Sequence, residues 1–139
     1  IKVMPLEKFK SIPKLTELTN NEMSILSKIN HPNIIKFVEM LQTSTHYYLV
    51  YEFCNGGTLE DKIKTQKMIN ENDSVAYFKQ LVSAFATLYE KKILHRDIKP
   101  TNILFHNGKL KLADFGFCKE LTNAAMAKTM VGSPIYMAP

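Results

Sequence analysis

Two consecutive glycines, Gly56 and Gly57, separate parts of the chain that have different secondary-structure patterns. Glycine tolerates backbone angles that other residues avoid and weakens both helices and strands, so the pair predicts a joint between regular elements. Before the joint, residues 34–41 and 47–53 are rich in β-branched and aromatic residues and predict strands, connected by a polar turn at residues 42–46. After the joint the pattern is mainly helical. The sequence therefore predicts an α+β chain with a β-rich first part.

Apolar residues at helical spacing predict two longer helices. The first covers residues 14–29 and ends before Pro32, because proline disfavours helical geometry in the residue that precedes it. The second covers residues 71–91, with Asn70 as its N-cap and Asp73 as the partner in a variant capping box. We expect its apolar face to consist of Val75, Phe78, Val82, Phe85 and Leu88 or Tyr89.

Shorter elements are predicted around the second helix. Residues 58–64 favour a short helix directly after the glycine joint. Asn107-Gly108 lies between residues 103–105 and 109–113, and an Asn-Gly pair between two strand-like runs is typical of a β-hairpin. The sequence therefore predicts a small hairpin within the helical part.

The composition excludes several classes of protein. The chain is 45% hydrophobic and 22% charged, which is ordinary for a soluble globular protein, and no apolar run approaches the length of a membrane span. Its two cysteines, Cys54 and Cys118, form no disulfide or metal-binding pattern and suit a reducing compartment, so we expect a cytoplasmic protein. The net charge is +5, but the lysines are scattered and form no basic stripe, so we expect no nucleic-acid partner.

A cluster of polar residues follows the second long helix. His95-Arg96-Asp97-Ile98-Lys99-Pro100-Thr101-Asn102 supplies a carboxylate, two cations and an amide, and Asp114-Phe115-Gly116 begins twelve residues after Asn102. These motifs at this spacing resemble the signature set of protein kinases. The resemblance extends along nearly the whole chain and implies a two-lobed protein-kinase fold. Residues 1–51 would belong to a small β-rich lobe with one helix, residues 52–57 to the hinge, and residues 58–139 to part of the helical lobe.

The resemblance implies ATP and Mg²⁺ as cofactors and serine or threonine hydroxyls of proteins as substrates. It makes Asp97 the base that meets the substrate hydroxyl, and Lys99 the cation that stabilises the transferred phosphoryl group. Asn102 and Asp114 would hold magnesium, which prefers the oxygens of carboxylates and amides. Any one of these residues alone would indicate no function, and the inference of a kinase site depends on finding the whole set at these spacings.

The resemblance also implies a lysine at the phosphates of ATP. Ile1-Lys2-Val3 matches the end of the strand that carries this lysine, and Glu22 lies on the helix whose glutamate pairs with it. A solvated helix face is the alternative interpretation of Glu22.

Residues 49–57 resemble the strand end and hinge that hold adenine. Recognition there uses mainly backbone groups, which the resemblance assigns to Glu52 and Cys54, with Tyr51 in the gatekeeper position. Leu104 would pack under the adenine ring, and a plain core role is compatible with that position. Four apolar or aromatic residues match the packed stack that connects the helix to the motif loops: Leu26, Phe37, His95 and Phe115.

The type of kinase is indicated by two further segments. Lys99-Pro100 resembles the serine/threonine class, and Ser133 lies where that class keeps a hydroxyl near the catalytic aspartate. Thr58 and Thr101 lie where kinases that prefer basic substrates often carry glutamate, which argues against a strong basic preference. Residues 52–57, 113–117 and 132–139 are most similar to the autophagy-initiating unc-51-like kinases, and calcium/calmodulin-dependent families share much of this pattern.

A phosphorylated residue in the segment 117–131 could regulate the site. Arg96 immediately precedes Asp97 and could pair bidentately with a phosphate. Thr122 and Thr129 are the candidates, and we expect Thr129 because it lies three residues before Gly132, the more usual place.

Two other functions stay open from the sequence. A pseudokinase or ATP-binding scaffold would typically lack at least one of Lys2, Asp97, Asn102 and Asp114, all of which are present. A basic binding module would bind RNA or DNA in a salt-sensitive way. The resemblance further implies that a glycine-rich loop before Ile1 and a glutamate after Pro139 are missing, so we expect a partial kinase domain whose activity in isolation is open.

Overall fold

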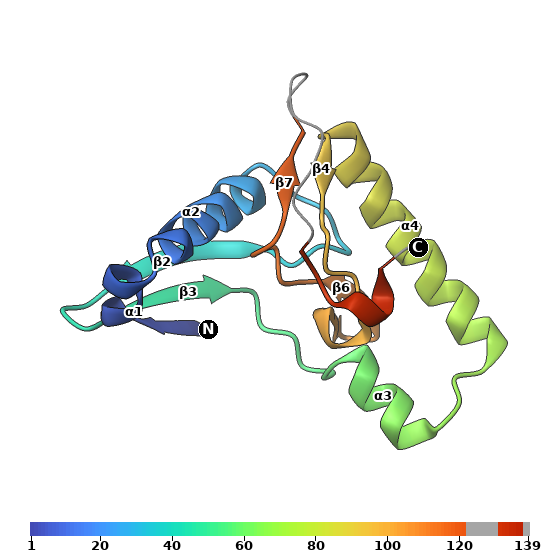
Figure 1. Cartoon of the computed structure of the whole chain (residues 1–139). Coiled ribbons are helices and arrows are strands. Elements are labelled where there is room, and N and C mark those ends of the chain that lie inside the picture. The colour runs from blue at the N-terminus through green and yellow to red at the C-terminus, as the bar shows by residue number, and fades with distance from the viewer. Residues whose placement is uncertain (122–130, 138–139) are drawn as a thin grey trace.

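A small antiparallel sheet forms one end of the molecule and two helices form the other (Figure 1). The computed structural model describes residues 1–121 and 131–137. The sheet consists of β1 (Lys2–Pro5), β2 (Phe37–Gln42) and β3 (His46–Tyr51), in the order β1-β3-β2. Lys2 pairs with Leu49, and Phe37 pairs with Tyr51. Leu49 of the central strand β3 is therefore paired on both sides, whereas Tyr51 at its end is paired only with β2.

Two helices connect β1 to β2. The sequence did not predict α1 (Leu6–Ser11), because a helix of 6 residues is too short to show apolar periodicity and Pro5 provides no side-chain cap. α2 (Pro13–Ser27) confirms the helix predicted at residues 14–29, and it begins with a proline, which suits the first turn because its missing N–H would be unpaired there anyway. The side chains of Ile25 and Leu26 on α2 are buried.

Side-chain caps fix where the helices of the second part begin. α3 (Leu59–Gln66) begins after Thr58, which forms a full capping box with Asp61, with both hydrogen bonds at 3.0 Å. α4 (Glu71–Glu90) begins after the predicted N-cap Asn70, whose side chain accepts a hydrogen bond from the Asp73 backbone N–H at 2.9 Å. The Asp73 carboxylate accepts from the Asn70 side-chain amide and not from the Asn70 backbone N–H, so the predicted N-cap is confirmed while the reciprocal backbone bond of a capping box is not formed.

The predicted apolar face of α4 is partly wrong. Leu88 is buried and Phe85 is partly buried, as expected. The other members of the predicted face are exposed: Val75, Phe78, Val82 and Tyr89. The face that packs on the core instead includes Tyr77, Leu81 and Ala84. Because α4 carries apolar residues around most of its circumference, periodicity predicts the helix without predicting which side meets the core.

Short strands complete the second part. β5 (Ile103–His106) and β6 (Lys109–Leu112) form the predicted hairpin around Asn107-Gly108. β4 (Ile93–Leu94) pairs with β7 (Lys119–Glu120), which the sequence did not predict because a strand of 2 residues carries no periodicity. The short 3-10 helices η1 (Pro100–Asn102) and η2 (Pro134–Tyr136) lie in the loops.

The strand predicted at residues 34–41 begins later, at Phe37. Ile34 and Ile35 are buried against the second part of the chain instead, because the Ile35 N–H donates to the Leu112 carbonyl at 2.8 Å. The Leu112 N–H donates in turn to the Asn33 carbonyl at 2.8 Å. The segment before β2 therefore joins the sheet part to the hairpin.

The glycine joint is packed against the hairpin. The Gly56 N–H donates to the Phe105 carbonyl at 2.8 Å, and the Phe105 N–H donates to the Gly57 carbonyl at 2.9 Å. A Cβ added to Gly56 would lie 2.7 Å from the Phe105 Cβ, so a larger residue does not fit there. The two glycines therefore allow a close approach of backbones as well as a change of direction.

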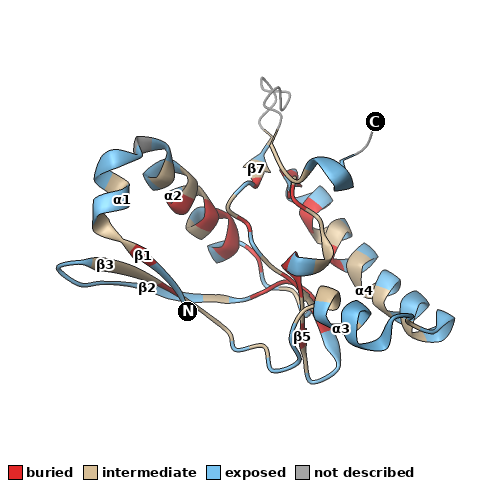
Figure 2. Cartoon of the chain, turned by 60° about the horizontal axis from the view of Figure 1, so that its bottom comes forward, coloured by how far each residue is buried: buried red, intermediate tan, exposed pale blue. Residues whose placement is uncertain are grey.

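One hydrophobic core connects the two parts, and the buried residues gather where the parts meet (Figure 2). Its buried members are Ile25, Leu26, Ile29, Ile34, Ile35, Ala84, Leu88, Ile93, Ile103, Phe105, Leu110, Leu112, Phe115 and Cys118. Among the described residues, no helix combines the length and the apolar character needed to cross a membrane.

Candidate active site

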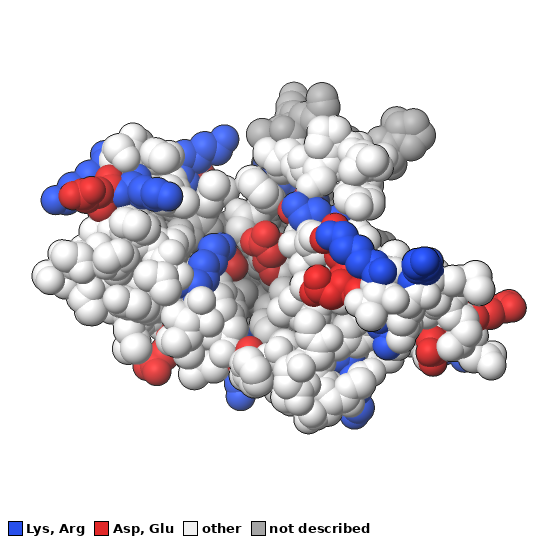
Figure 3. All heavy atoms as spheres, turned by 90° about the horizontal axis from the view of Figure 1, so that it is seen from below, with Lys and Arg blue, Asp and Glu red and all other residues white. Residues whose placement is uncertain are grey.

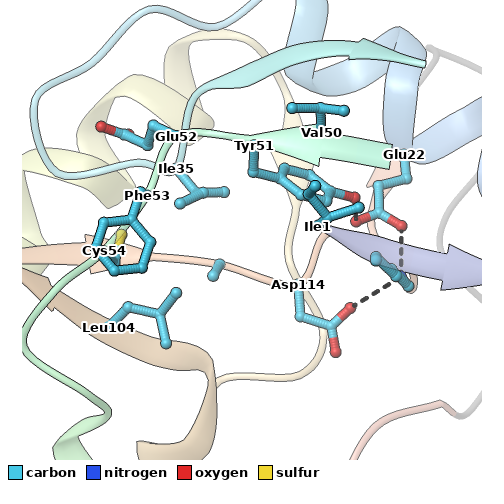
Figure 4. A pocket seen from close by; sticks show the side chains of 12 residues that line it. Ile1, Glu22, Ile35, Val50, Tyr51, Glu52, Phe53, Cys54, Leu104 and Asp114 are labelled. Atoms are coloured by element: carbon cyan, nitrogen blue, oxygen red, sulfur yellow. Dashed lines mark hydrogen bonds and ion pairs between the residues drawn. The ribbon is translucent and has the colours of Figure 1, made fainter. Parts of the chain in front are cut away.

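A cavity of about 720 Å³ opens between the sheet part and the hairpin (Figure 4). Its lining residues are Ile1, Lys2, Glu22, Ile35, Val50, Tyr51, Glu52, Phe53, Cys54, Leu104, Ala113 and Asp114. Most of them are apolar, and the charges of Lys2, Glu22 and Asp114 are gathered at one end. Figure 3 shows acidic and basic atoms close together around the hollow on this face. The cavity suits a ligand that has an apolar part and a polar, charged part.

Lys2 lies between two carboxylates at the charged end of the cavity. Its Nζ is 2.9 Å from Glu22 Oε2 and 3.9 Å from Asp114 Oδ1. Glu22 is only 3% exposed, so its interpretation as a solvated helix residue is wrong. The side chain of Lys2 remains 44% exposed, which leaves its ammonium accessible to an anionic ligand.

The second oxygen of Glu22 is bound by Tyr51. The Tyr51 hydroxyl donates to Glu22 Oε1 at 2.8 Å, and the Tyr51 ring packs edge-on against Phe37 with 5.8 Å between centroids. Burial raises the pKa of Tyr51 far above its usual range, and the adjacent Glu22 carboxylate raises it further. Tyr51 is therefore a permanent hydrogen-bond donor.

Asp97 is the centre of a group of hydrogen bonds in the loop after β4. Its Oδ2 is 2.8 Å from Lys99 Nζ and accepts from Asn102 Nδ2 at 2.9 Å. Its Oδ1 accepts from Ser133 Oγ at 2.8 Å, and Lys99 Nζ also donates to Ser133 Oγ at 2.9 Å. The structure therefore brings Asp97, Lys99 and Asn102 together and adds Ser133 from a segment far along the chain.

These contacts set the ionisation of Asp97 and Lys99. Burial alone would raise the pKa of Asp97, but the hydrogen bonds from Lys99, Ser133 and Asn102 outweigh burial and lower the pKa. The hydrogen bond to Asp97 raises the pKa of Lys99. At neutral pH the site therefore presents a carboxylate that can accept a proton beside a fixed positive charge.

Asn102 and Asp114 provide oxygen atoms that fit magnesium. The Ala113 N–H donates to the Asn102 carbonyl at 2.9 Å, which places Asp114 beside the Asp97 loop. The Asn102 amide nitrogen binds Asp97, while its Oδ1 accepts no hydrogen bond from a described residue, and the Asp114 side chain is 43% exposed. The described residues contain no group of three or more His, Cys, Asp or Glu that could hold a metal. Such a pair suits magnesium that is also bound by phosphate oxygens and water.

Glu52 and Cys54 line the opposite end of the cavity, with Leu104 facing them (Figure 4). The Glu52 carboxylate points away from the cavity, and its Oε1 accepts from Lys111 Nζ and from the Lys36 N–H, both at 2.8 Å. Burial, and then the Glu52 charge, raise the pKa of Cys54, which keeps it a neutral thiol. Leu104 also packs against the core, so this residue both lines the cavity and contributes to core packing.

The four residues of the predicted stack lie in or against the core. Leu26 and Phe115 are buried, Phe37 packs against the core, and the rings of His95 and Phe115 are 4.8 Å apart. His95 Nδ1 accepts from the Asp97 N–H at 3.3 Å, while Nε2 is 3.1 Å from the Ala113 carbonyl. These contacts require a neutral ring with its hydrogen on Nε2, in agreement with burial, which lowers the pKa of His95.

Arg96 links the loop to the segments on either side of it. Its Nε donates to the Phe117 carbonyl at 2.7 Å, and its own carbonyl lies so close to Gly132 that a Cβ there would collide with it. Gly132 has a φ of +120°, which also favours glycine. Thr129, the predicted phosphorylation site, lies outside the described residues.

α2 also contacts the segment after Phe115. Asn21 Nδ2 donates to the Cys118 carbonyl at 2.6 Å, and Lys28 Nζ is 2.9 Å from Glu120 Oε2. Asn21 precedes Glu22, so neighbouring residues of one helix contact both the cavity and this segment.

Two contacts of the site were not predicted from the sequence. Tyr51 was expected in the gatekeeper position but not bonded to Glu22, and no role was expected for Lys111, which binds Glu52. These pairs are separated by 29 and 59 positions, so the motif that contains Tyr51 does not indicate its partner, and Lys111 belongs to no motif.

Comparisons with known proteins identify the family. The protein kinase domain model matches residues 1–139. Serine/threonine-protein kinase ATG1a of Arabidopsis thaliana is 40% identical over 143 residues, covering 100% of this chain and 23% of the relative. Serine/threonine-protein kinase unc-51 of Caenorhabditis elegans is 40% identical over 144 residues, covering 94% and 17%. Serine/threonine-protein kinase ULK1 of Homo sapiens is 36% identical over 140 residues, covering 94% and 13%.

The chain thus spans less than a quarter of the length of these relatives, and their names confirm the resemblance to the unc-51-like group. The mixed α+β fold and the match of the family model over all 139 residues lead to one assignment: the chain belongs to the protein kinase domain family.

Proposed function

We propose that this chain is the part of a serine/threonine protein kinase that transfers the γ-phosphate of ATP to hydroxyl groups of protein substrates. The observation that carries the proposal is the arrangement around Asp97. Its buried carboxylate binds Lys99, Asn102 and Ser133, and it lies in the loop that adjoins the charged end of the cavity. The names of the relatives, all serine/threonine-protein kinases, support the same reaction.

In this proposal Asp97 orients the substrate hydroxyl and accepts its proton. Its lowered pKa supports this role, because the carboxylate is anionic at neutral pH. Lys99 lies 2.8 Å from Asp97 and places a positive charge where negative charge develops on the transferred phosphoryl group. Ser133 binds both residues and fixes their separation.

ATP would bind in the cavity with its phosphates at the charged end. Lys2, held by Glu22, would contact the phosphates, and Asn102 and Asp114 would hold magnesium. When bound, magnesium would neutralise part of the negative charge of the phosphates. The adenine ring would lie between residues 52–54 and Leu104, where the Glu52 carbonyl and the backbone groups of Cys54 would serve as hydrogen-bond partners.

We extend the proposal to the organisation and regulation of the chain. Residues 52–57 act as the hinge between residues 1–51 and 58–139. Arg96 receives the phosphate of a phosphorylated Thr129. Two free cysteines among the described residues support a cytoplasmic location.

Phosphate transfer from Mg-ATP to a generic serine/threonine substrate tests the proposal in the complete protein. Asp97→Asn keeps the size of the side chain and removes its basicity, so the rate should fall by about 100-fold or more. Glu39→Gln is the matched control, because Glu39 is an exposed carboxylate on β2, away from the cavity. Equal rates for Asp97→Asn and the unmodified protein would refute the role of Asp97. ATP binding without any transfer would favour an ATP-binding scaffold.

A further inference from the structure

The Tyr51 hydroxyl makes a contact that the proposed roles do not use. We propose that it is a positioning group for phosphoryl transfer: it holds the buried Glu22 carboxylate, and Glu22 in turn holds Lys2 at the phosphate end of the cavity (Figure 4). This inference rests on the proposed function, because it assigns Lys2 to the phosphates of a nucleotide.

The burial of Glu22 gives the hydroxyl its importance. The side chain of Glu22 is only 4% exposed, so water does little to satisfy its two oxygens. A buried carboxylate is costly unless it is paired and hydrogen-bonded. Among the described residues, Lys2 binds Oε2 at 2.9 Å and Tyr51 binds Oε1 at 2.8 Å. Loss of the Tyr51 hydroxyl would leave one oxygen without a partner.

The two partners of Glu22 differ in how firmly they are held. Lys2 lies on the edge strand β1, is 44% exposed and is already within 3.9 Å of Asp114, so a bound phosphate would compete with Glu22 for its ammonium. Tyr51 lies at the end of the central strand β3, and its ring is packed against Phe37. The Tyr51–Glu22 bond therefore persists when Lys2 shares its charge with a ligand.

This bond also connects α2 to the sheet. Glu22 is on α2, and Tyr51 is on the strand that is paired on both sides within the sheet. A hydrogen bond of 2.8 Å between them fixes the carboxylate relative to the most firmly held strand of this part of the molecule. Tyr51 is thus a positioning residue that acts through Glu22 on Lys2.

The alternative to a positioning role is that the Tyr51 ring only forms part of the cavity wall. Tyr51→Phe separates the two roles, because it keeps the ring beside Phe37 and removes only the hydroxyl. Tyr48→Phe is the matched control: Tyr48 lies on the same strand, and its hydroxyl makes no hydrogen bond to a described residue. Glu22→Gln, alone and combined with Tyr51→Phe, tests whether the effect passes through the carboxylate.

Calorimetric binding of ADP and of adenosine, with magnesium present, measures the effect in the complete protein. If the hydroxyl positions Lys2 through Glu22, Tyr51→Phe should weaken ADP binding by about tenfold, the scale of one hydrogen bond to a charged group. Adenosine binding should stay unchanged, since it does not use Lys2, and it also shows that the cavity is intact. The turnover rate should fall by about tenfold as well, and Tyr51→Phe should add little in the Glu22→Gln background.

Each other outcome is decisive. Unchanged ADP affinity and turnover in Tyr51→Phe would overturn the inference while leaving the proposed function in place. An equal loss of ADP and adenosine affinity would show that Tyr51 only shapes the cavity, which also overturns it. If the unmodified protein binds neither ligand and transfers no phosphate, the proposed function fails, and this inference fails with it.

Discussion

Lys111 Nζ lies 2.8 Å from Glu52 Oε1 and joins the hairpin to the segment that leaves the sheet. Both side chains are largely buried, at 13% and 22% exposed. The same Glu52 oxygen accepts from the Lys36 N–H, and the Glu52 N–H donates to the Lys36 carbonyl. Three separate segments of the chain therefore meet at one carboxylate.

Lys111→Met should destabilise the fold. It removes the charge that pairs with Glu52 but keeps most of the side-chain volume, so we expect a loss of about 1–3 kcal/mol in the free energy of unfolding. Urea denaturation measures this loss. Lys109→Met is the control, because Lys109 is an exposed lysine on the same strand. Equal losses in the two variants would show that the Lys111–Glu52 pair contributes nothing.

Gly132→Ala should displace residues 131–137 from the Asp97 loop. The new Cβ would collide with the Arg96 carbonyl, and φ of +120° is unfavourable for alanine. Because Ser133 follows directly and binds Asp97, phosphate transfer should fall by about tenfold or more. Gly108→Ala is the comparison: its φ is +75° and no atom lies within 4 Å of the new Cβ, so it should cost stability of about 1 kcal/mol and no activity. Normal activity of Gly132→Ala would contradict this account.

The stability of the protein should fall below about pH 6.5, in part because of His95. Burial lowers the pKa of His95 in the folded state, so the unfolded chain takes up a proton first as the pH falls. That uptake favours unfolding, until the pH also passes the folded-state pKa. His95→Phe keeps an aromatic ring against Phe115 and removes the titrating group. Its free energy of unfolding should therefore change less between about pH 7.5 and about pH 5.5, by about 1 kcal/mol. An unchanged pH dependence would show that His95 does not contribute.

Ser133→Ala should raise the pKa of Asp97, because it removes the hydrogen bond to Oδ1. The stabilisation that Asp97 gains from its partners is present above its unfolded-state pKa of about 4 and is lost as the pH falls through the folded-state pKa. In the variant this loss should be smaller and should be complete at a higher pH, because the folded-state pKa lies closer to the unfolded-state value. Carbon NMR titration of the Asp97 carboxyl measures the shift, with Ser24→Ala on the exposed side of α2 as the control. Identical titration curves would exclude a role of Ser133 in the ionisation of Asp97.

Local sequence predicted the elements whose causes are local. The start of α4 was predicted because Asn70 caps it through a residue three positions away, and the hairpin because Asn107-Gly108 favours a tight turn. Asp97, Lys99 and Asn102 lie within one short segment, and the resemblance of that segment to protein kinases singled them out. Their mutual contacts could be expected because they are close in sequence.

Features that depend on distant contacts could not be predicted. The core-facing side of α4 is selected by what packs against Ala84 and Leu88, and the pairing of β7 by the position of β4. The bond from Tyr51 to Glu22 requires α2 to lie beside the end of β3. An aromatic residue in a strand indicates only the strand, so the use of its hydroxyl becomes visible when the elements are assembled.

The adjacent residues Asn21 and Glu22 have a consequence for cooperativity. Asn21 binds the Cys118 carbonyl and Glu22 binds Lys2, so a rigid displacement of α2 breaks both contacts together. A ligand that favours the position of α2 in which Glu22 contacts Lys2 then also favours the contact of Asn21 with Cys118. By thermodynamic reciprocity, an event that stabilises the Asn21–Cys118 contact raises the affinity for such a ligand by the same factor by which the ligand stabilises that contact.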